Sequence, residues 1–162
     1  MDYIEGYKAY NKDFTDKYGN KHFAGEKLHI EGEVKVGPFN GNGFHLCKKF
    51  EDTFRYVPDE CILCEVIGFG KISNEYIDYY YDYDGIYACS DLYIKRVVPR
   101  EEIVEMAKQL PDYRLERLIQ TYSMTDEEIK QIENSLSKNS KKIVKAIDYY
   151  HRNQKDAYKR ED

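Results

Sequence analysis

The chain changes character at Pro99, and this change limits the folds that are open to it. All ten glycines and all four cysteines lie before Pro99, whereas residues 99–162 contain no glycine. Glycine is frequent in the turns between strands and is unfavourable inside helices. Residues 1–98 are therefore predicted to form a small sheet-containing domain, and residues 99–162 a helical region.

Charge follows the same division. Residues 1–98 hold 12 basic and 17 acidic residues, a net charge of −5, and residues 99–162 hold 13 of each sign. A net charge of −5 argues against broad, sequence-independent nucleic-acid binding, which relies on Lys and Arg meeting phosphates, but it leaves a local basic patch open. Because the chain has neither a long apolar run nor an apolar leader segment, we expect a cytoplasmic protein with reduced cysteines and no membrane contact.

Four segments after Pro99 carry apolar residues at helical spacing. Residues 99–110 carry a stripe of Ile103, Met106, Ala107 and Leu110, and residues 111–122 one of Leu115, Leu118, Ile119 and Tyr122. Residues 125–136 carry Ile129, Ile132 and Leu136, and residues 140–158 carry Ile143, Val144, Ile147 and Tyr150. Thr125 and Glu128 have the spacing of a capping box. The spacing predicts three or four helices whose stripes form a core, packed on or beside the first domain.

Residues 1–98 alternate apolar and polar residues in short runs, which is typical of strands. We expect strands at residues 6–11, 27–37 (with a break at Gly32), 43–47 and 61–70. A short helix is expected at 48–57, with Phe50 and Phe54 one turn apart. A hairpin is expected over 74–94, turning at Asp84-Gly85. The predicted fold class is α+β, with a mostly antiparallel sheet in residues 1–98 and the helices in 99–162.

His45, Cys47, Cys61 and Cys64 raise the question of a zinc site. Cys-x-x-Cys binds zinc when a tight turn directs both sulfurs at one ion, whereas on a strand residues i and i+3 point to opposite faces. The zinc-deaminase pattern is incomplete, because Cys47 stands where its Glu is required and Pro58 is not adjacent to Cys61. We therefore expect no metal ligands and no cofactor.

A tyrosine- and aspartate-rich segment is the strongest candidate for binding. In a strand, Tyr79, Tyr81 and Tyr83 would occupy one face, and Asp78, Tyr80, Asp82 and Asp84 the other. One interpretation is a hairpin with a packed Tyr face and a solvated acidic face; the other is an interface with aromatic anchors among acids that face a basic partner. The candidate binding residues are Asp78, Tyr79, Tyr81, Asp82, Tyr83 and Asp84, with the tyrosines as anchors and the acids as steering charges.

The remaining features carry no complete catalytic motif. His22, His29 and His151 have no acid or nucleophile at a telling spacing and are expected to be surface or packed residues. The glycine spacing matches neither a P-loop nor a dinucleotide fingerprint.

Several ordered motifs resemble a family of small domains that recurs in phage and prophage proteins. They are YKAYNKDF near the start, GFHLCKKFEDTFRY, CILCEVIGFG and YACSDLYIKRVV, and together they cover about residues 5–98. The resemblance implies a mobile-element setting and brings no assigned activity.

The order of elements also resembles that of ADP-ribosyltransferases, which hold NAD with a residue on the first strand and use a Glu on a late strand. Lys8, flanked by Tyr7 and Tyr10, stands at the first of these positions. Glu65 lies on a strand of the right kind, although a half-buried or edge Glu is the simpler interpretation. Similar fold order alone does not establish an activity.

Together these features predict an accessory protein that binds a host macromolecule and inhibits a defence or nucleic-acid-handling system. The partner would be a host protein with a basic or nucleic-acid-binding surface. An NAD-using enzyme is the alternative, and the sequence leaves the oligomeric state open.

We predict that the purified protein holds no stoichiometric zinc and that a chelator leaves its melting temperature unchanged. Elemental analysis checks the first expectation and thermal unfolding the second. About one zinc per chain would contradict the prediction, and His45, Cys47, Cys61 and Cys64 would then be the first ligands to replace.

Overall fold

The computed structural model describes residues 2–37, 41–57, 60–75, 85–136, 141–142, 144–145, 147 and 149. The chain forms two compact units, Met1–Val98 and Pro99–Asp162. The first contains a five-stranded antiparallel sheet and the second contains helices, so the predicted α+β class is confirmed.

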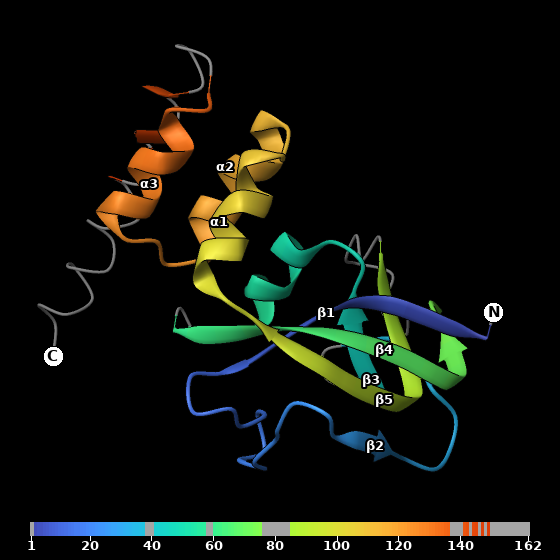
Figure 1. Ribbon diagram of the computed structural model, residues 1–162. Coiled ribbons are helices and arrows are strands. Elements are labelled where there is room, and N and C mark those ends of the chain that lie inside the picture. The colour runs from blue at the N-terminus through green and yellow to red at the C-terminus, as the bar shows by residue number, and fades with distance from the viewer. Residues whose placement is uncertain are drawn as a thin grey trace, which may run out of the picture. The chain divides into compact units, whose positions relative to one another are not determined.

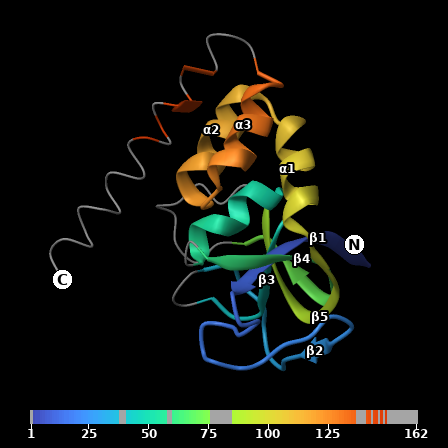
Figure 2. The same cartoon turned by 60° about the vertical axis from the view of Figure 1, so that its left-hand side comes forward.

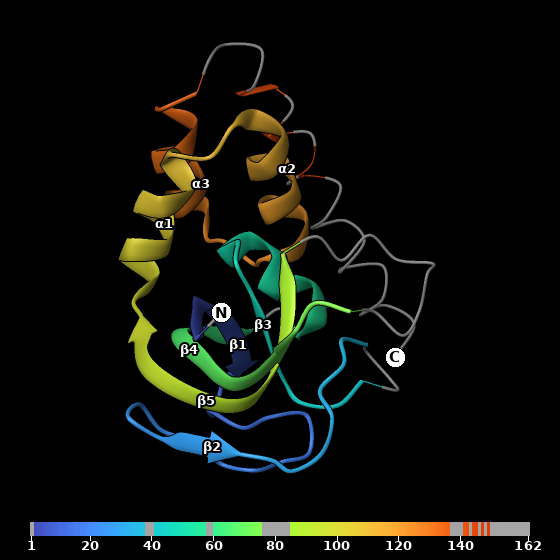
Figure 3. The ribbon, with the colours of Figure 1, turned by 90° about the vertical axis from the view of Figure 1, so that its right-hand side faces the viewer.

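The sheet of the first unit closes on itself. Its strands are β1 (Tyr3–Asn11), β2 (Lys27–His29), β3 (Phe44–Cys47), β4 (Cys61–Ser73) and β5 (Ile86–Val98), in the order β2-β5-β3-β1-β4. The end strand β4 also pairs with β5, so that β5, β3, β1 and β4 make a closed ring (Figure 1). Figure 3 shows β4 and β5 bending around β1. Closure removes most of the exposed sheet edge.

The interior of this ring is apolar and crowded. Its buried residues are Ile4, Tyr10, Leu46, Cys64, Val66, Cys89, Leu92 and Ile94. A Cβ atom at Gly6 would lie 2.6 Å from the carbonyl oxygen of Cys47 and 2.6 Å from a methyl group of Leu46. Glycine at position 6 therefore lets β1 approach β3 closely.

A 3₁₀ helix, η1 (Phe50–Tyr56), follows β3. It occupies the position of the short helix expected at 48–57, and both Phe50 and Phe54 are buried. The ring of Phe50 packs edge-on against Tyr7 of β1, with 6.1 Å between ring centroids.

The alternating segment expected at 27–37, with its break at Gly32, forms a strand at Lys27–His29. Gly32 adopts a φ of 97°, in agreement with the expected break, and Lys35 then forms an isolated bridge with Asn42. Residues 76–84 of the hairpin expected over 74–94 lie outside the described residues, so that hairpin stays a prediction. In the described part, β5 pairs with β4 from Leu63↔Val98 to Ser73↔Ala88 along one edge and with β3 and β2 along the other.

The second unit contains α1 (Arg100–Lys108), α2 (Asp112–Thr121) and α3 (Asp126–Glu133) (Figure 2). The described residues within 141–149 are helical as well. Most of the predicted stripe residues are buried, namely Ile103, Ala107, Leu115, Leu118, Ile119, Tyr122, Ile129, Ile132 and Val144. No helix in the described part of the chain is long and apolar enough to span a membrane.

The predicted capping box forms at the start of α3. Thr125 Oγ1 accepts from the backbone N–H of Glu128, and the Glu128 carboxylate accepts from the N–H of Thr125. Arg100 donates to the same carboxylate at 2.8 Å and stacks its guanidinium 4.9 Å from the centroid of the Tyr122 ring. This cluster connects the start of α1 to the start of α3.

Gly6→Ala should destabilise the first unit because the new methyl group meets backbone. Overpacking of this kind costs about 1–3 kcal/mol, measurable as a lower urea midpoint. Gly19→Ala is the control: Gly19 has a φ of 85° and open space around its Cβ position, so only the left-handed backbone is penalised, by about 1 kcal/mol. An unchanged midpoint for Gly6→Ala would contradict the crowded interior.

Candidate functional site

The sequence-predicted binding residues 78, 79 and 81–84 lie outside the described residues, and their role stays a prediction. The other candidates can be placed.

The cysteines considered for zinc lie on strands. Cys61 and Cys64 are both in β4, where three residues of separation turn them to opposite faces, and Cys64 is fully buried. Burial raises the pKa of Cys47 and of Cys64 to about 12, so both remain thiols at neutral pH. No group of three or more His, Cys, Asp or Glu residues in the described part of the chain is arranged to hold a metal ion.

His45 has both ring nitrogens engaged by backbone. The N–H of Gly37 donates to Nε2 at 3.1 Å, and Nδ1 lies 3.0 Å from the carbonyl oxygen of Gly43. Burial, followed by the positive charge of Lys8, lowers the pKa of His45 to about 4. A neutral ring that accepts at Nε2 and donates at Nδ1 satisfies both contacts, so this His organises the turn before β3.

Lys8 and Glu65, the positions suggested by the ADP-ribosyltransferase resemblance, are engaged inside the first unit. The Lys8 ammonium donates to the carbonyl oxygen of His45 at 2.8 Å, and burial lowers the pKa of this amine. Arg96 forms a bidentate ion pair with Glu65, in which Nε and Nη2 of Arg96 each lie 2.9 Å from a carboxylate oxygen. Glu65 is thus the half-buried, paired Glu of the simpler interpretation.

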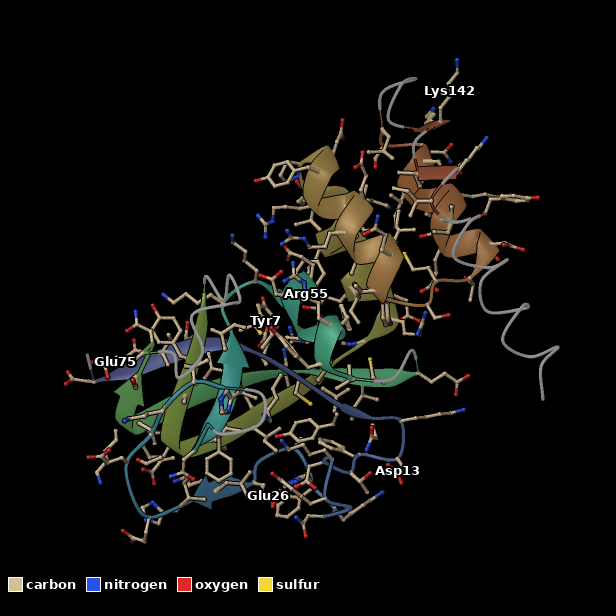
Figure 4. The ribbon with its side chains drawn as sticks, turned by 180° about the vertical axis from the view of Figure 1, so that it is seen from behind. Tyr7, Asp13, Glu26, Arg55, Glu75 and Lys142 are labelled. Atoms are coloured by element: carbon tan, nitrogen blue, oxygen red, sulfur yellow. The ribbon has the colours of Figure 1, made fainter. Side chains whose placement is uncertain are left out.

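The loop between β1 and β2, residues 12–26, is ordered around the carboxylate of Asp16 (Figure 4 labels Asp13 and Glu26 on it). Asp16 Oδ1 accepts from the backbone N–H groups of Tyr18 and Asn20, at 2.9 and 3.0 Å. Asp16 Oδ2 accepts from the Asn20 side chain and lies 2.9 Å from Nε2 of His22. We call this segment the Asp16 loop.

His22 joins the two ends of the Asp16 loop. Its buried ring lies between Asp16 and Glu26, whose carboxylate oxygen is 2.9 Å from Nδ1. The ring also packs against Tyr10 of β1, with 5.1 Å between centroids. Burial acts to raise the pKa of Asp16, but its hydrogen bonds to His22, Asn20 and Tyr18 outweigh burial and lower it to about 2.

His29, at the end of β2, also lies between two carboxylates. Its Nδ1 is 2.8 Å from Asp91 of β5, and its Nε2 is 2.9 Å from Glu31. The hydrogen bonds to Glu31 and Asp91 raise the pKa of His29. Ser90 donates to Asp91 at 2.6 Å, and this bond, together with His29, lowers the pKa of Asp91.

His22 is packed and His29 is at the surface, as expected, but each also lies between two carboxylates that no sequence spacing signalled. Glu26 follows His22 by four residues, but that spacing signals a pair only on a helix, and this segment is a loop. Asp91 is 62 residues from His29 and reaches it only because β2 pairs with β5.

The outer face of the Asp16 loop carries aromatic rings. Tyr18 is 77% exposed and Phe23 is 61% exposed, although the backbone between them is held by internal hydrogen bonds. The N–H of His22, for example, donates to the carbonyl oxygen of Phe14, and the N–H of Gly19 to that of Asp16. The loop thus presents two rings from a fixed backbone, a feature that the sequence analysis did not single out.

Stability should depend on pH through His29. Because its pKa is raised by folding, its contribution is complete below its ordinary pKa of about 6.5 and is lost as the pH rises through the folded-state value. The pKa values of Asp91 and Glu31 are lowered, so their contributions are lost only as the pH falls below about 4.

The urea midpoint measured against pH checks this expectation. The difference between the native protein and His29→Gln should be largest between about pH 4 and pH 6.5 and should shrink at higher pH. Glu33→Gln, at a neighbouring exposed acid, serves as the control. A difference that does not change with pH would contradict the His29 contacts.

The comparisons with known proteins place the chain in a family. Residues 4–106 match the family described as a domain of unknown function (DUF7666). No curated protein matches the chain, and no solved structure does. Since the match spans more than half of the sequence, including all of the sheet except Tyr3, the chain belongs to the DUF7666 family.

Proposed function

We propose that this protein is a binding module, an accessory protein of the phage or prophage type that acts by binding a host macromolecule. The observation that carries the proposal is the Asp16 loop, which exposes Tyr18 and Phe23 on a backbone already fixed by Asp16 and His22. The phage-type setting rests on the resemblance of the sequence motifs.

A fixed loop is suited to binding because the conformational entropy lost in ordering it is already lost when the protein folds. Immobilising backbone and side chains at the moment of association weakens affinity, so a loop held in its bound shape binds more tightly. Exposed Tyr and Phe side chains supply large contact areas, and aromatic residues are enriched at the centres of interfaces. Tyr18 and Phe23 meet both conditions.

The Tyr- and Asp-rich segment remains the second part of this proposal. With Tyr79, Tyr81 and Tyr83 as anchors and Asp78, Asp82 and Asp84 as steering charges, it would suit a basic or nucleic-acid-binding host protein. Inhibition of a defence or nucleic-acid-handling system is the outcome we propose for that contact.

The NAD-using alternative is less well supported. A transferase of that kind needs a carboxylate free to act on the substrate, whereas Glu65 is engaged by Arg96 at two oxygens. Lys8 is likewise engaged, through its bond to the carbonyl oxygen of His45.

Affinity capture from a host-cell lysate, followed by mass spectrometry, tests the proposed function. The native chain should retain one dominant partner. Truncation of an interface anchor costs about 2 kcal/mol or more, roughly 30-fold in affinity. The paired change Tyr18→Ala and Phe23→Ala, and separately Tyr81→Ala, should therefore weaken capture while the proteins remain folded.

Tyr113→Ala is the matched control, since Tyr113 is 70% exposed on α2 and lies outside both proposed regions. Its capture should equal that of the native chain. Absence of any dominant partner, together with transfer of label from NAD to a protein, would overturn the binding proposal in favour of the enzyme.

A further inference from the structure

The exposed side of the Asp16 loop and the first residue of β2 are basic as well as aromatic. Residues 12–27 carry two exposed rings, Tyr18 and Phe23, and four exposed lysines, Lys12, Lys17, Lys21 and Lys27. The Lys17 ammonium is 5.0 Å from the centroid of the Tyr18 ring. These six residues are called the Lys-aromatic surface.

The carboxylates of the same segment form hydrogen bonds within the loop. Asp13 Oδ1 accepts from the N–H and the hydroxyl of Thr15, at 3.2 and 2.6 Å. Asp16 accepts from Tyr18, Asn20 and His22, and Glu26 contacts His22. The carboxylates therefore order the loop. The four lysines are exposed. Lys17 lies over the Tyr18 ring, Lys21 donates to the carbonyl oxygen of Asp13, and Lys12 pairs with the exposed Glu60 at 3.0 Å.

This arrangement sets the loop apart from the rest of its unit. Residues 12–27 hold four lysines against three carboxylates, whereas residues 1–98 as a whole hold 12 basic residues against 17 acidic ones. A local positive surface on an acidic unit attracts an anionic partner to one place. The negative remainder opposes extended contact with a polyanion, so the partner should be short at the point of contact.

The types of side chain favour a nucleic acid over an acidic protein. Lysine is depleted at protein–protein interfaces, where arginine is the preferred cation, and residues 12–27 contain no arginine. Exposed aromatic rings beside lysines are the combination that binds single strands, because the bases stack on the rings and the phosphates meet the ammonium groups.

We propose that the Lys-aromatic surface binds a short stretch of single-stranded nucleic acid, with bases stacked on Tyr18 and Phe23. Lys17 and Lys21 contact the adjoining phosphates. A duplex fits this surface poorly, because its bases are stacked on one another and their faces are closed to the rings. This inference rests on the part of the proposed function that assigns binding to the Asp16 loop.

Fluorescence anisotropy with a labelled 12-nucleotide oligo(dT) and the full chain tests the proposal. Binding should be measurable at low salt, and the two phosphate contacts of Lys17 and Lys21 would give a salt slope of about −1.4. Tyr18→Ala with Phe23→Ala should weaken binding by about tenfold or more. Lys17→Gln with Lys21→Gln should weaken it and reduce the slope. A duplex of equal length should bind more weakly.

Tyr113→Ala and Lys130→Gln, at exposed positions on α2 and α3, are matched controls and should bind as the native chain does. The proposal is overturned if oligo(dT) does not bind at low salt, if the ring variants bind normally, or if a polyglutamate peptide competes as well as oligo(dT). Those results leave capture of a host protein untouched, so they are distinguishable from failure of the proposed function.

Discussion

The carboxylate of Asp16 is the group on which the functional account depends. The Asp16 side chain accepts hydrogen bonds from two backbone N–H groups and from the side-chain amide of Asn20, and it contacts the buried His22. These bonds take the place of a regular ladder of backbone hydrogen bonds, which the loop lacks. Buried and half-buried polar groups of this kind specify one conformation only when they are satisfied together. Without these hydrogen bonds the backbone of the loop would be free to move, and the rings of Tyr18 and Phe23 could pack against the loop itself.

The closed sheet provides the frame for this loop. β1 and β2, at its two ends, both belong to the sheet, and the Tyr10 ring of β1 packs against Phe14 and His22. The N–H of Gly25 donates to the carbonyl oxygen of Ile94, and the N–H of Ile94 to that of Glu26. The loop is thereby fastened to β5 as well as to β1, so its order derives from the core of the first unit.

Local signals predicted much of the fold but little of the site. The helices, the capping box of Thr125 and Glu128, and the strands around Lys8, Leu46 and Cys64 follow from periodicity and caps that act within a few residues. The pairing of His29 with Asp91 depends on the register of β2 against β5, which no local spacing signals. The loop itself has no periodic pattern, so its order could not be read from spacing.

The order of the Asp16 loop in the free protein is the most direct test of this account. Amide order parameters from ¹⁵N relaxation should be as high for Tyr18, Asn20 and His22 as for β1 and β4, near 0.85. Asp16→Ala should lower the loop values while leaving those of the strands unchanged. Values below about 0.6 for the loop of the native protein would contradict the claim that the rings are presented from a fixed backbone.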